Sequence, residues 1–519
     1  MSFAIKLVLS SVLVIVSLTA SCDGARILGF FPTPSKSHLI IHSAIANAIA
    51  EQGHDVTVVS THKLIKKNPP YRYIQLDIDG YSASKMSETV VNPPPFYKKI
   101  QVMMDIFNSY ANSSVNHPKV KKLMAEESFD LVILGYFFNE FLLGIPAHFK
   151  CPVVMSFMVQ TVPFLNGLVG NPNEAAYVPS TLFGGKQPLG FFKRVVNFLF
   201  VNIGERFALK YLQEWYQEDL YNKNFPADKY PSFEEMKKNV SLVLTNSHFS
   251  QGTIRPNVPG MVEIGGIQIK EKPDPLPEDL KSIMDNATEH GVVYFSLGSN
   301  VQGSTLDPVK LQALFNVLSQ LPQTVLWKWG DSVLPGESPN IIYKSWLPQD
   351  DILPHQNVKL FITHGGGGSV VESSFHGVPM VGIPIFADQS SNMEGVVKQG
   401  FGLSIDYSVL TEEGLRSAVN EVMSNKMYRE NVQRFSKVYK DRPMTAKQTA
   451  VFWLEYVLRH HGAPHMQSPA VHMNFFQLAS LDVIGFLVAC IYVIYKVFKF
   501  IFLFVKSMIW RTKSKSKKE

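Results

Sequence analysis

The stretch KLFITHGGGGSVVESSFHGVPMVGI, residues 359–383, decides the fold. Its first part, 359–363, is a short apolar run that predicts a buried strand, and four consecutive glycines follow it. A helical pattern over 369–376 then leads to a second apolar run at 380–383. Strand, turn, helix and strand in this order build a parallel sheet that is covered by helices. The segment therefore predicts an α/β domain.

Similar units occur on both sides of a proline-rich break. Residues 25–31 and 56–60 predict strands that flank a helix from about residue 37 to residue 52. The charged, proline-rich segment Lys270 to Pro277 suits an extended linker. We therefore expect two Rossmann-like domains that face a ligand-binding cleft. The expected boundaries are 25–269 for the first domain, 270–287 for the linker and 288–460 for the second domain. Further strands are predicted at 131–134, 152–157, 292–297 and 325–328, and further helices at 306–320 and 411–424.

Both ends of the chain carry patterns that are typical of membrane targeting. Lys6, an apolar run and then small or polar residues have the order of a secretory signal peptide over residues 1–24. The region 474–505 contains an apolar run that is long enough to cross a bilayer. The basic tail 506–519 fits the positive-inside rule. We expect a single-pass type I protein whose body lies in the lumen.

The tail and the body carry further signs of a secretory location. Lysines lie third and fifth from the end of the chain, similar to the dilysine signals that return membrane proteins to the endoplasmic reticulum. A plain stop-transfer charge cluster is the alternative interpretation. A body in the lumen would expose the acceptor sequences for N-glycosylation at Asn112, Asn239 and Asn286.

Composition excludes several classes of protein. Hydrophobic residues make up 46% and charged residues 18% of the 519 residues, which argues against a disordered chain and against a multi-span membrane protein. The net charge is +6, of which the tail 506–519 holds +5, so the nearly neutral body is not expected to bind nucleic acid. Cys22, Cys151 and Cys490 suggest neither a disulfide framework nor a cysteine-based metal site.

The four glycines from Gly365 to Gly368 predict a site for a diphosphate. Glycine lets the backbone approach a phosphate, and the following helix N-terminus supplies free N–H groups and a partial positive charge. The loop lacks the Lys-Ser/Thr ending of a Walker loop and the spacing of a dinucleotide fingerprint. Neither an NTPase nor an NAD-dependent oxidoreductase is therefore favoured. The structural alternative is a glycine-rich turn in which Ser369 and Glu372 form a capping box.

The order and spacing of residues around this loop resemble the donor-binding signature of the UDP-glycosyltransferase family, glycosyltransferase family 1. The signature consists of Trp346-Leu-Pro-Gln349, Thr363 to Gly366 with Ser369 and Glu372, His376 to Met380, and Asp388-Gln389 with Asn392. The resemblance extends from the leader to the tail. It implies a GT-B fold whose C-terminal domain holds the UDP-sugar.

The resemblance also implies a role for each donor residue. Trp346 would stack on uracil, and Gln349 and Glu372 would contact the nucleoside. Asp388 and Gln389 would hold the transferred sugar. The diphosphate would be held by Ser299, by His364 and by the backbone of the loop from Gly365 to Ser369, which includes Gly366. No metal and no other cofactor is expected, because the helix N-terminus would replace a cation at the leaving UDP.

On the acceptor side, His38 lies at the start of the first predicted helix. The helix dipole disfavours a protonated imidazole there, so His38 is suited to be a general base, and the family places its base at this position. In many relatives an aspartate orients this histidine, but Gly135 stands at its place here. Glu140, a few residues later, is the alternative orienting carboxylate.

Phenylalanine is frequent in the expected acceptor domain, over residues 137–205, where it would form core and line an apolar pocket. Within this domain the run Phe191 to Leu212 either lies on the membrane surface or forms a buried amphipathic helix. By resemblance, the expected activity is inverting transfer of a hexose to hydroxyl groups of small lipophilic acceptors, as in detoxification. Gly368, where many vertebrate members carry Asn, indicates an invertebrate-type member and glucose as the sugar. A non-catalytic UDP-sugar-binding subunit is the alternative, and either homo- or hetero-oligomers are possible.

Overall fold

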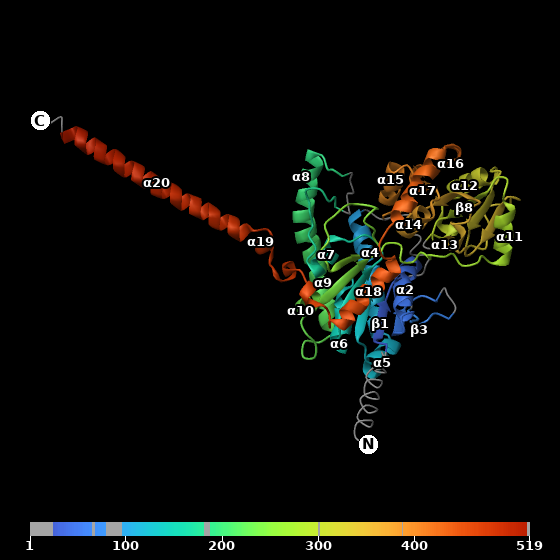
Figure 1. The fold of residues 1–519 in the computed structure, drawn as a ribbon, viewed down its shortest axis with the longest axis horizontal. Helices are drawn as coiled ribbons and strands as arrows, with labels where there is room; N and C mark the ends of the chain where they lie inside the picture. Colours follow the sequence, from blue (N-terminus) through green and yellow to red (C-terminus); the bar gives the residue numbers. More distant parts are fainter. Residues whose placement is uncertain are drawn as a thin grey trace, which may run out of the picture. The chain divides into compact units, whose positions relative to one another are not determined.

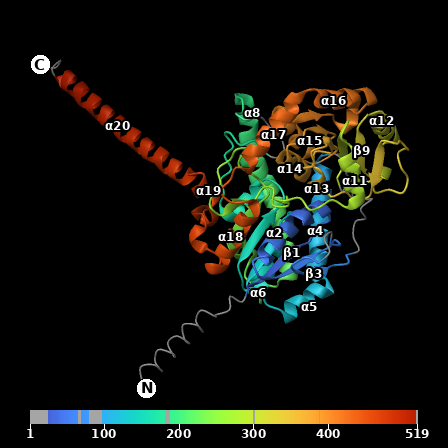
Figure 2. The ribbon, with the colours of Figure 1, turned by 45° about the vertical axis from the view of Figure 1, so that its right-hand side comes forward.

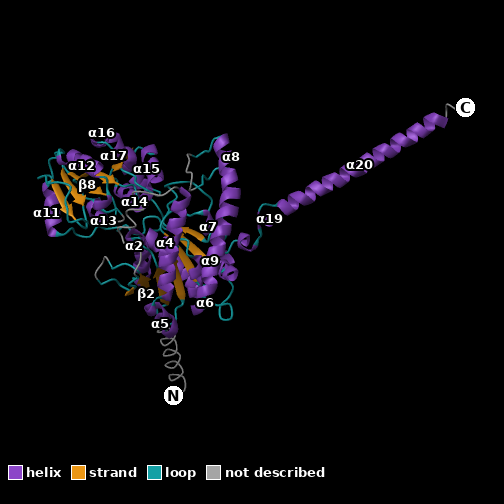
Figure 3. Ribbon diagram, turned by 180° about the vertical axis from the view of Figure 1, so that it is seen from behind, coloured by secondary structure: helices purple, strands orange, loops and turns teal. Residues whose placement is uncertain are grey.

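The computed structural model describes residues 24–64, 68–78, 96–180, 187–298, 301–386 and 388–515. It divides into a large unit that ends at Gln467 and a C-terminal unit from Ser468. The large unit contains two parallel β-sheets with helices on their faces (Figure 1). Seen from behind, the strands of each sheet lie among helices (Figure 3). The predicted α/β class with two Rossmann-like domains is therefore confirmed.

The first sheet has the strand order β3-β2-β1-β4-β5-β6-β7. All of its strand pairs are parallel, with Ile27 of β1 aligned to Val56 of β2 on one side and to Leu131 of β4 on the other. Strands buried on both faces are expected to be continuous apolar runs, and β1, β4 and β5 have this composition. The bounds are β1 Arg26–Phe31, β2 Asp55–Ser60, β3 Arg72–Gln75, β4 Leu131–Gly135, β5 Val153–Phe157, β6 Val240–Thr245 and β7 Met261–Glu263.

Helices of the first domain pack on both faces of this sheet or extend from its edges. Their bounds are α2 Lys36–Ala50, α4 Phe96–Asn116, α5 Pro118–Glu126, α6 Gly144–Phe149, α7 Pro163–Val169, α8 Phe191–Leu199, α9 Lys210–Asn224 and α10 Phe233–Lys238. A 3₁₀ turn, η1 (Glu140–Leu143), precedes α6, and a π-helical segment, η2 (Phe200–Leu209), joins α8 to α9.

The second sheet has the order β10-β9-β8-β11-β12-β13, and all of its strand pairs are parallel. Separate apolar clusters cover its two faces. The strands are β8 Val292–Ser296, β9 Thr324–Lys328, β10 Ile341–Lys344, β11 Val358–Thr363, β12 Met380–Gly382 and β13 Gly402–Ser404. The helices are α11 Glu278–Asn286, α12 Pro308–Ser319, α13 Gln349–Ile352, α14 Gly367–His376, α15 Gln389–Lys398, α16 Glu412–Ser424 and α17 Lys426–Lys440, with 3₁₀ turns η3 Gly303–Thr305 and η4 Tyr407–Val409.

Two expected domain boundaries differ from the packing. The second half of the predicted linker is helix α11, whose Leu280 and Met284 are buried in the core of the second domain. Helix α18 (Ala446–Arg459), assigned by sequence to the second domain, buries Ala450 and Leu454 in the core of the first domain. Figure 2 shows α18 on the side of the first domain, where it contacts α2. An apolar helix face indicates burial, but it does not say which core receives it.

The structure also adds five strands to those predicted. β3 and β10 are partly exposed edge strands, and β7 and β13 have only three residues each, so their patterns are weak. β6 is different, because its sequence VSLVLT is an apolar run of ordinary strand length that the sequence reading left out.

The C-terminal unit contains one helix that is long and apolar enough to cross a membrane. This helix, α20, spans Leu481–Lys515, and its part from Leu481 to Trp510 has a mean hydropathy of 2.2. Within the predicted anchor region 474–505, the short helix α19 (Phe475–Leu478) and a positive φ at Ser480 precede α20. The 3₁₀ turns η5 Pro464–Met466 and η6 Pro469–His472 lead up to α19. The predicted signal peptide lies almost wholly outside the described residues.

Candidate donor and acceptor site

The residues of the donor signature lie on or just after loops that follow strands β10, β11 and β12 of the second sheet. Trp346 and Gln349 follow β10, the glycine-rich loop follows β11, and Asp388 follows β12. Because the strands are parallel, these loops all leave the carboxyl edge of the sheet, where ligands bind in open α/β folds. Ser299, predicted at the same edge after β8, lies outside the described residues.

Glycine is required at several positions around the loop. Gly298 and Gly365 have φ values of +83° and +79°, which favour glycine. A Cβ atom on Gly366 would lie 2.5 Å from Nε2 of His364, and one on Gly298 would lie 2.7 Å from the same ring. The imidazole of His364 thus packs against the backbone at Gly298 and at Gly366, where glycine has no side chain.

Helix α14 starts earlier than predicted, and the capping box of the structural alternative is not formed. It begins at Gly367, with Gly366 as the N-cap, so Ser369 lies inside the first turn. The carboxylate of Glu372 is engaged elsewhere, as described below. The first N–H groups of α14 therefore have no side-chain cap and, with the helix dipole, favour an anion. A Cβ atom on Gly368 would meet no other atom within 4 Å, so the space in front of this turn is open.

His364 presents a neutral, unpaired nitrogen beside this turn. Burial and the nearby ammonium group of Lys328 lower the pKa of His364 to about 4. Its Nδ1 atom is buried and has no hydrogen-bond partner in the part of the chain that the structure describes. The opposite ring nitrogen, Nε2, is the one that faces Gly366, the N-cap residue of α14.

Gln349 and Glu372 form a polar pair next to the loop. Nε2 of Gln349 donates to Oε2 of Glu372 at 2.6 Å and to Oγ of Ser369 at 3.3 Å, while the hydroxyl of Tyr294 donates to Oε1 of Gln349 at 3.2 Å. Burial and the charge of Asp350 raise the pKa of Glu372 to about 8. The pair suits hydroxyl groups such as those of a ribose, which both donate and accept.

Two lysines that the sequence reading missed flank Trp346. The indole is 40% exposed, and its centroid lies 4.1 Å from Nζ of Lys36 and 4.7 Å from Nζ of Lys328. Nζ of Lys328 also donates to the carbonyl of Gly298 at 2.9 Å. Burial and Lys36 lower the pKa of Lys328 to about 8. Lys328 is the last residue of strand β9, so the sequence could have placed it at the ligand-binding edge of the second sheet. The contact of Lys36 with Trp346 joins the two domains and could not be predicted from the sequence pattern.

Asp388 and Gln389 have different roles, although they are neighbours in the sequence. Asp388 is exposed, and Oδ2 of its carboxylate accepts from Nδ2 of Asn392 at 2.8 Å. Gln389 is 2% exposed, and its side-chain oxygen accepts from the backbone N–H groups of Ile385 at 2.8 Å and Phe386 at 3.0 Å. The carboxylate of Asp388 is therefore available to a hydroxyl group of a sugar. The side-chain amide oxygen of Gln389 instead stabilises the turn after β12.

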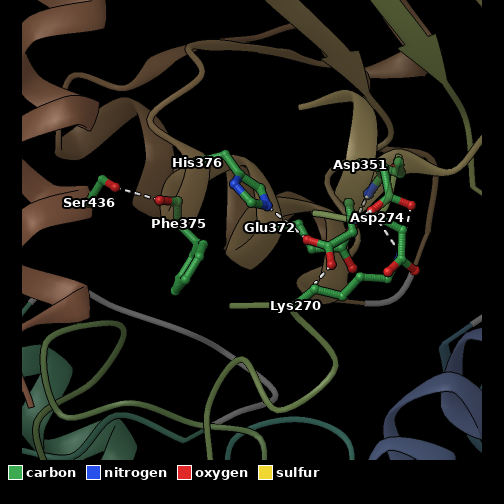
Figure 4. A network of polar contacts seen from close by, with 9 residues as sticks. Lys270, Asp274, Asp351, Glu372, Phe375, His376 and Ser436 are labelled. Atoms are coloured by element: carbon green, nitrogen blue, oxygen red, sulfur yellow. Dashed lines mark hydrogen bonds and ion pairs between the residues drawn. The ribbon is translucent and has the colours of Figure 1, made fainter. Parts of the chain in front are cut away.

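The start of the linker is attached to helix α13, which begins with Gln349 (Figure 4). Nζ of Lys270 pairs with Asp351 at 2.6 Å and with Asp274 at 2.8 Å, and its backbone N–H donates to Asp350 at 2.7 Å. The other oxygen of Asp350 lies 2.7 Å from Nε2 of His376. Because Asp350 follows Gln349 in the chain, these bonds fix helix α13 between the linker and α14.

His38 lies in the first turn of α2 and is held by a hydroxyl group. Its Nδ1 atom is 3.1 Å from Oγ1 of Thr33, and its ring stacks against Phe107 and Phe137 at centroid distances of 6.1 and 5.5 Å. Burial and the charge of His62 lower the pKa of His38 to about 4. The imidazole is therefore neutral at physiological pH, as a general base must be.

Glu140 does not orient His38, which corrects the sequence expectation. Glu140 is buried, and Oε1 of its carboxylate accepts from the hydroxyl of Tyr136 at 2.8 Å. Within the described residues, the hydrogen-bond partner of the His38 ring is Thr33. The bond to Tyr136, one turn earlier in the chain, holds Glu140 in the core of the first domain.

The place of the absent aspartate is filled by a second histidine. A Cβ atom on Gly135 would lie 3.1 Å from Nε2 of His42 and 3.2 Å from Cδ1 of Phe31. The imidazole of His42 is buried, stacks on Phe31 and lies 2.8 Å through its Nδ1 from Oγ of Ser156. Gly135 and His42 therefore pack closely, and a side chain at position 135 would require His42 or Phe31 to move by a few tenths of an ångström.

The three predicted glycosylation sites differ in exposure. Asn239 and Asn286 are exposed, while Asn112 is half-buried in α4 and Oδ1 of its side chain accepts from Asn224 at 3.0 Å. Glycosylation stays a prediction, and Asn239 and Asn286 have the more accessible side chains.

The chain is similar to transferases of known activity. The family model described as "UDP-glucoronosyl and UDP-glucosyl transferase" matches residues 30–516. The chain is 35% identical over 479 residues to the UDP-glycosyltransferase UGT5 of Dactylopius coccus, covering 89% of both chains. It is 34% identical over 402 residues to the human UDP-glucuronosyltransferase 1A10, covering 75% of this chain and 72% of that protein.

Solved structures agree on the fold. The glycotransferase of kitacinnamycin matches with a TM-score of 0.56 at 18% identity, covering 84% of this chain and 99% of that one. The calicheamicin glycosyltransferase CalG4 matches with a TM-score of 0.55 at 18% identity, covering 84% of this chain and 98% of that one. Both are similar to this chain across its two Rossmann-like domains, which is the GT-B arrangement. The family match across the chain and the arrangement of the donor loop together show that the chain belongs to the UDP-glycosyltransferase family, whose members transfer a sugar from a UDP-sugar donor.

Proposed function

We propose that this protein transfers glucose from UDP-glucose, with inversion, to a hydroxyl group of small lipophilic acceptors. The observation that carries the proposal is the neutral imidazole of His38 in the first turn of α2. Lys36, two residues earlier on the same helix, reaches the indole of Trp346 in the second domain. This contact supports the proposal that His38 faces an acceptor bound between the two domains.

In the proposed reaction, Nε2 of His38 takes the proton of the acceptor hydroxyl as that oxygen attacks the anomeric carbon. The bond between this carbon and the β-phosphate oxygen breaks, and UDP leaves with the electron pair. Thr33 accepts a hydrogen bond from Nδ1–H, which leaves the lone pair of Nε2 free. The N-terminus of α14, with Lys328, stabilises the negative charge of the leaving diphosphate. We propose that these groups take the place of a metal ion.

We further propose that α20 anchors the protein in the membrane of the endoplasmic reticulum with the body in the lumen. The length and hydropathy of α20 and the basic residues that follow it support this orientation. Conjugation of lipophilic compounds there would make them soluble in water and would serve their clearance.

The test is turnover by membranes that carry the full-length protein. UDP-glucose or UDP-glucuronate is supplied with a panel of simple phenols and alcohols, and conjugate and released UDP are measured. We expect conjugate from the wild type with UDP-glucose and none above background from His38→Ala. UDP should still protect His38→Ala against thermal unfolding, because among the described residues the ring of His38 contacts Thr33, Phe107 and Phe137 of the first domain.

A second candidate function is that of a UDP-sugar-binding subunit without activity. It is favoured because, among the residues that the structure describes, the hydrogen-bond partner of the His38 ring is the hydroxyl of Thr33 and not a carboxylate. Under that alternative no acceptor is conjugated, while UDP still raises the unfolding temperature. Glu372→Gln provides the control for binding, with Glu394→Gln on the exposed side of α15 as the matched surface variant. Because the carboxyl of Glu372 is mostly protonated at neutral pH, loss of its hydrogen bond to the nucleoside should weaken UDP binding by about 0.5–1.5 kcal/mol in Glu372→Gln only.

A further inference from the structure

Helix α8 and the segment η2 have their polar and apolar faces reversed relative to a normal surface helix. Asn197, Val201 and Glu205, spaced four residues apart, face the domain and are buried. Oδ1 of Asn197 accepts from the backbone N–H of Ser180 at 2.8 Å, and its Nδ2 donates to the carbonyl of Ala175 at 2.7 Å. Two of the three residues that hold this helix to the domain are therefore polar.

The opposite side of the helix exposes large apolar side chains. Phe192 is 82% exposed, and six further apolar side chains in this segment are at least 42% exposed. They are Phe191, Val195, Val196, Phe198, Leu199 and Ile203. A surface helix normally places such residues against the core, and a contiguous apolar patch of this kind marks an interaction site. Helix α8 lies at the margin of the first domain in Figure 1.

The charge of the segment indicates which partner it fits. From residue 175 to residue 204 the sequence contains no Asp or Glu, while it contains Lys186, Lys193 and Arg194. The side chains of Lys193 and Arg194 are exposed next to the apolar patch. Exposed Phe, Val and Leu with adjacent basic residues are typical of helices that lie in the headgroup region of an anionic bilayer.

We propose that the outer face of α8 and η2 binds the surface of the bilayer in which the chain is anchored. The inference rests on the proposed membrane anchor, not on the transferase reaction. The hydrogen bonds of Asn197 hold the helix to the domain, so its apolar side chains are free to enter the boundary between headgroups and acyl chains. Lys193 and Arg194 contact lipid phosphates. An apolar acceptor dissolved in the membrane then lies next to the domain that binds it.

The experiment measures how deeply labelled positions lie in the membrane. Full-length protein, with its native cysteines replaced by serine, receives a single cysteine and a nitroxide label, and is placed in nanodiscs of neutral and anionic lipid at one protein copy per disc. The labelled variants are Phe192→Cys and Val333→Cys. Val333 is an equally apolar control on the second domain and is 77% exposed. A protein that keeps Cys490, which lies within α20, reports whether the anchor has inserted.

We expect the label at position 192 to collide severalfold more with oxygen, relative to a water-soluble nickel chelate, than the label at position 333. This preference should weaken in anionic discs when Lys193 and Arg194 are both changed to Glu. If Cys490 reports insertion but position 192 collides with the chelate as freely as position 333, the inference is overturned. Shielding of position 192 that occurs only with several copies per disc also overturns it, because a second copy then covers the face.

Discussion

His38 is paired with a hydroxyl group, and this changes how its tautomer is controlled. A carboxylate can only accept, so it forces the proton onto the facing nitrogen, whereas a hydroxyl can also donate. Oγ1 of Thr33 already accepts from the N–H of Ser35 at 3.1 Å and lies 3.5 Å from the carbonyl of Ser35. Donation to that carbonyl leaves Thr33 to accept from Nδ1–H of His38. Nε2 then keeps the lone pair that a base requires.

Thr33→Val should lower kcat by up to about tenfold, the value of one hydrogen bond, while Thr33→Ser should stay close to the wild type. Val has nearly the shape of Thr but has no hydroxyl to select the tautomer. The measurement is the pH profile of kcat together with KM for the donor. We expect the profile to change in Thr33→Val with an unchanged donor KM. A loss that Thr33→Ser shares would mean that the packing at this position matters, and not the hydroxyl.

At the scale of elements, the donor site depends on where helices begin and which core they join. Helix α14 starts at Gly367 because Gly365 takes a positive φ and Gly366 leaves room for His364. Helix α18 returns to the first domain because its apolar face fits against α2. The start of α14 and the packing of α18 can each be tested with two substitutions, one at a constrained position and one at an open or exposed position.

Gly365→Ala should destabilise the second domain, while Gly368→Ala should not. At position 365 the added Cβ would lie 2.5 Å from Cγ of Met393, and the positive φ alone costs about 1–2 kcal/mol for a residue with a side chain. At position 368 there is no atom within 4 Å. The measurement is the thermal unfolding temperature of the two full-length variants without ligand. Equal unfolding temperatures would show that the loop relaxes around the added methyl group.

Leu454→Ala should destabilise the first domain by about 2–5 kcal/mol, although position 454 follows the second domain in the sequence. Leu454 is fully buried in the core of the first domain, whereas Phe452, two residues earlier, is 41% exposed. Hydrogen exchange of α2 amides should therefore become faster in Leu454→Ala and stay unchanged in Phe452→Ala. Faster exchange confined to the second domain would contradict this assignment of α18.

At the scale of the whole molecule, buried neutral histidines connect stability to pH. Burial lowers the pKa of His42 to about 3, and burial with the charge of Arg442 lowers that of His248 to about 4. His38 and His364 are lowered to about 4 as well. All four are neutral in the folded state down to pH values at which the unfolded chain is protonated.

Stability should therefore be fully present above about pH 6.5 and should be lost as the pH falls toward 4. Each buried histidine contributes a slope of about 1.4 kcal/mol per pH unit in this window, because the unfolded chain binds one proton more. Glu372 acts in the opposite direction, because its pKa is raised in the folded state and its protonation stabilises the fold as the pH falls. Glu372 binds one proton, whereas the four histidines together bind four. Unfolding temperatures of the detergent-solubilised protein between pH 8 and pH 5 measure the sum. His42→Asn should make the decline shallower, and a decline as steep as that of the wild type would contradict the assignment to buried histidines.

Local sequence was sufficient for what depends on neighbours along the chain. Apolar runs and turn residues predicted eight of the strands in two α/β domains, and the run of glycines predicted a turn between a strand and a helix. The resemblance to a donor signature singled out Trp346, Gln349, Glu372 and Asp388. They lie on or just after loops that leave one edge of the second sheet, and their donor roles stay a prediction.

Contacts between distant segments were decided only by the tertiary structure. Three examples are the contact of Lys36 with Trp346, the packing of His42 against Gly135, and the burial of α18 in the core of the first domain. In each of them the contacting residues are far apart in the sequence, so no local pattern predicts the contact. Periodicity shows that a face is apolar but not what it will touch, and α8 is the clearest case because its apolar face is exposed. Sequence determined the chemistry available to this protein, and packing determined which groups meet, because a contact depends on the paths of both segments.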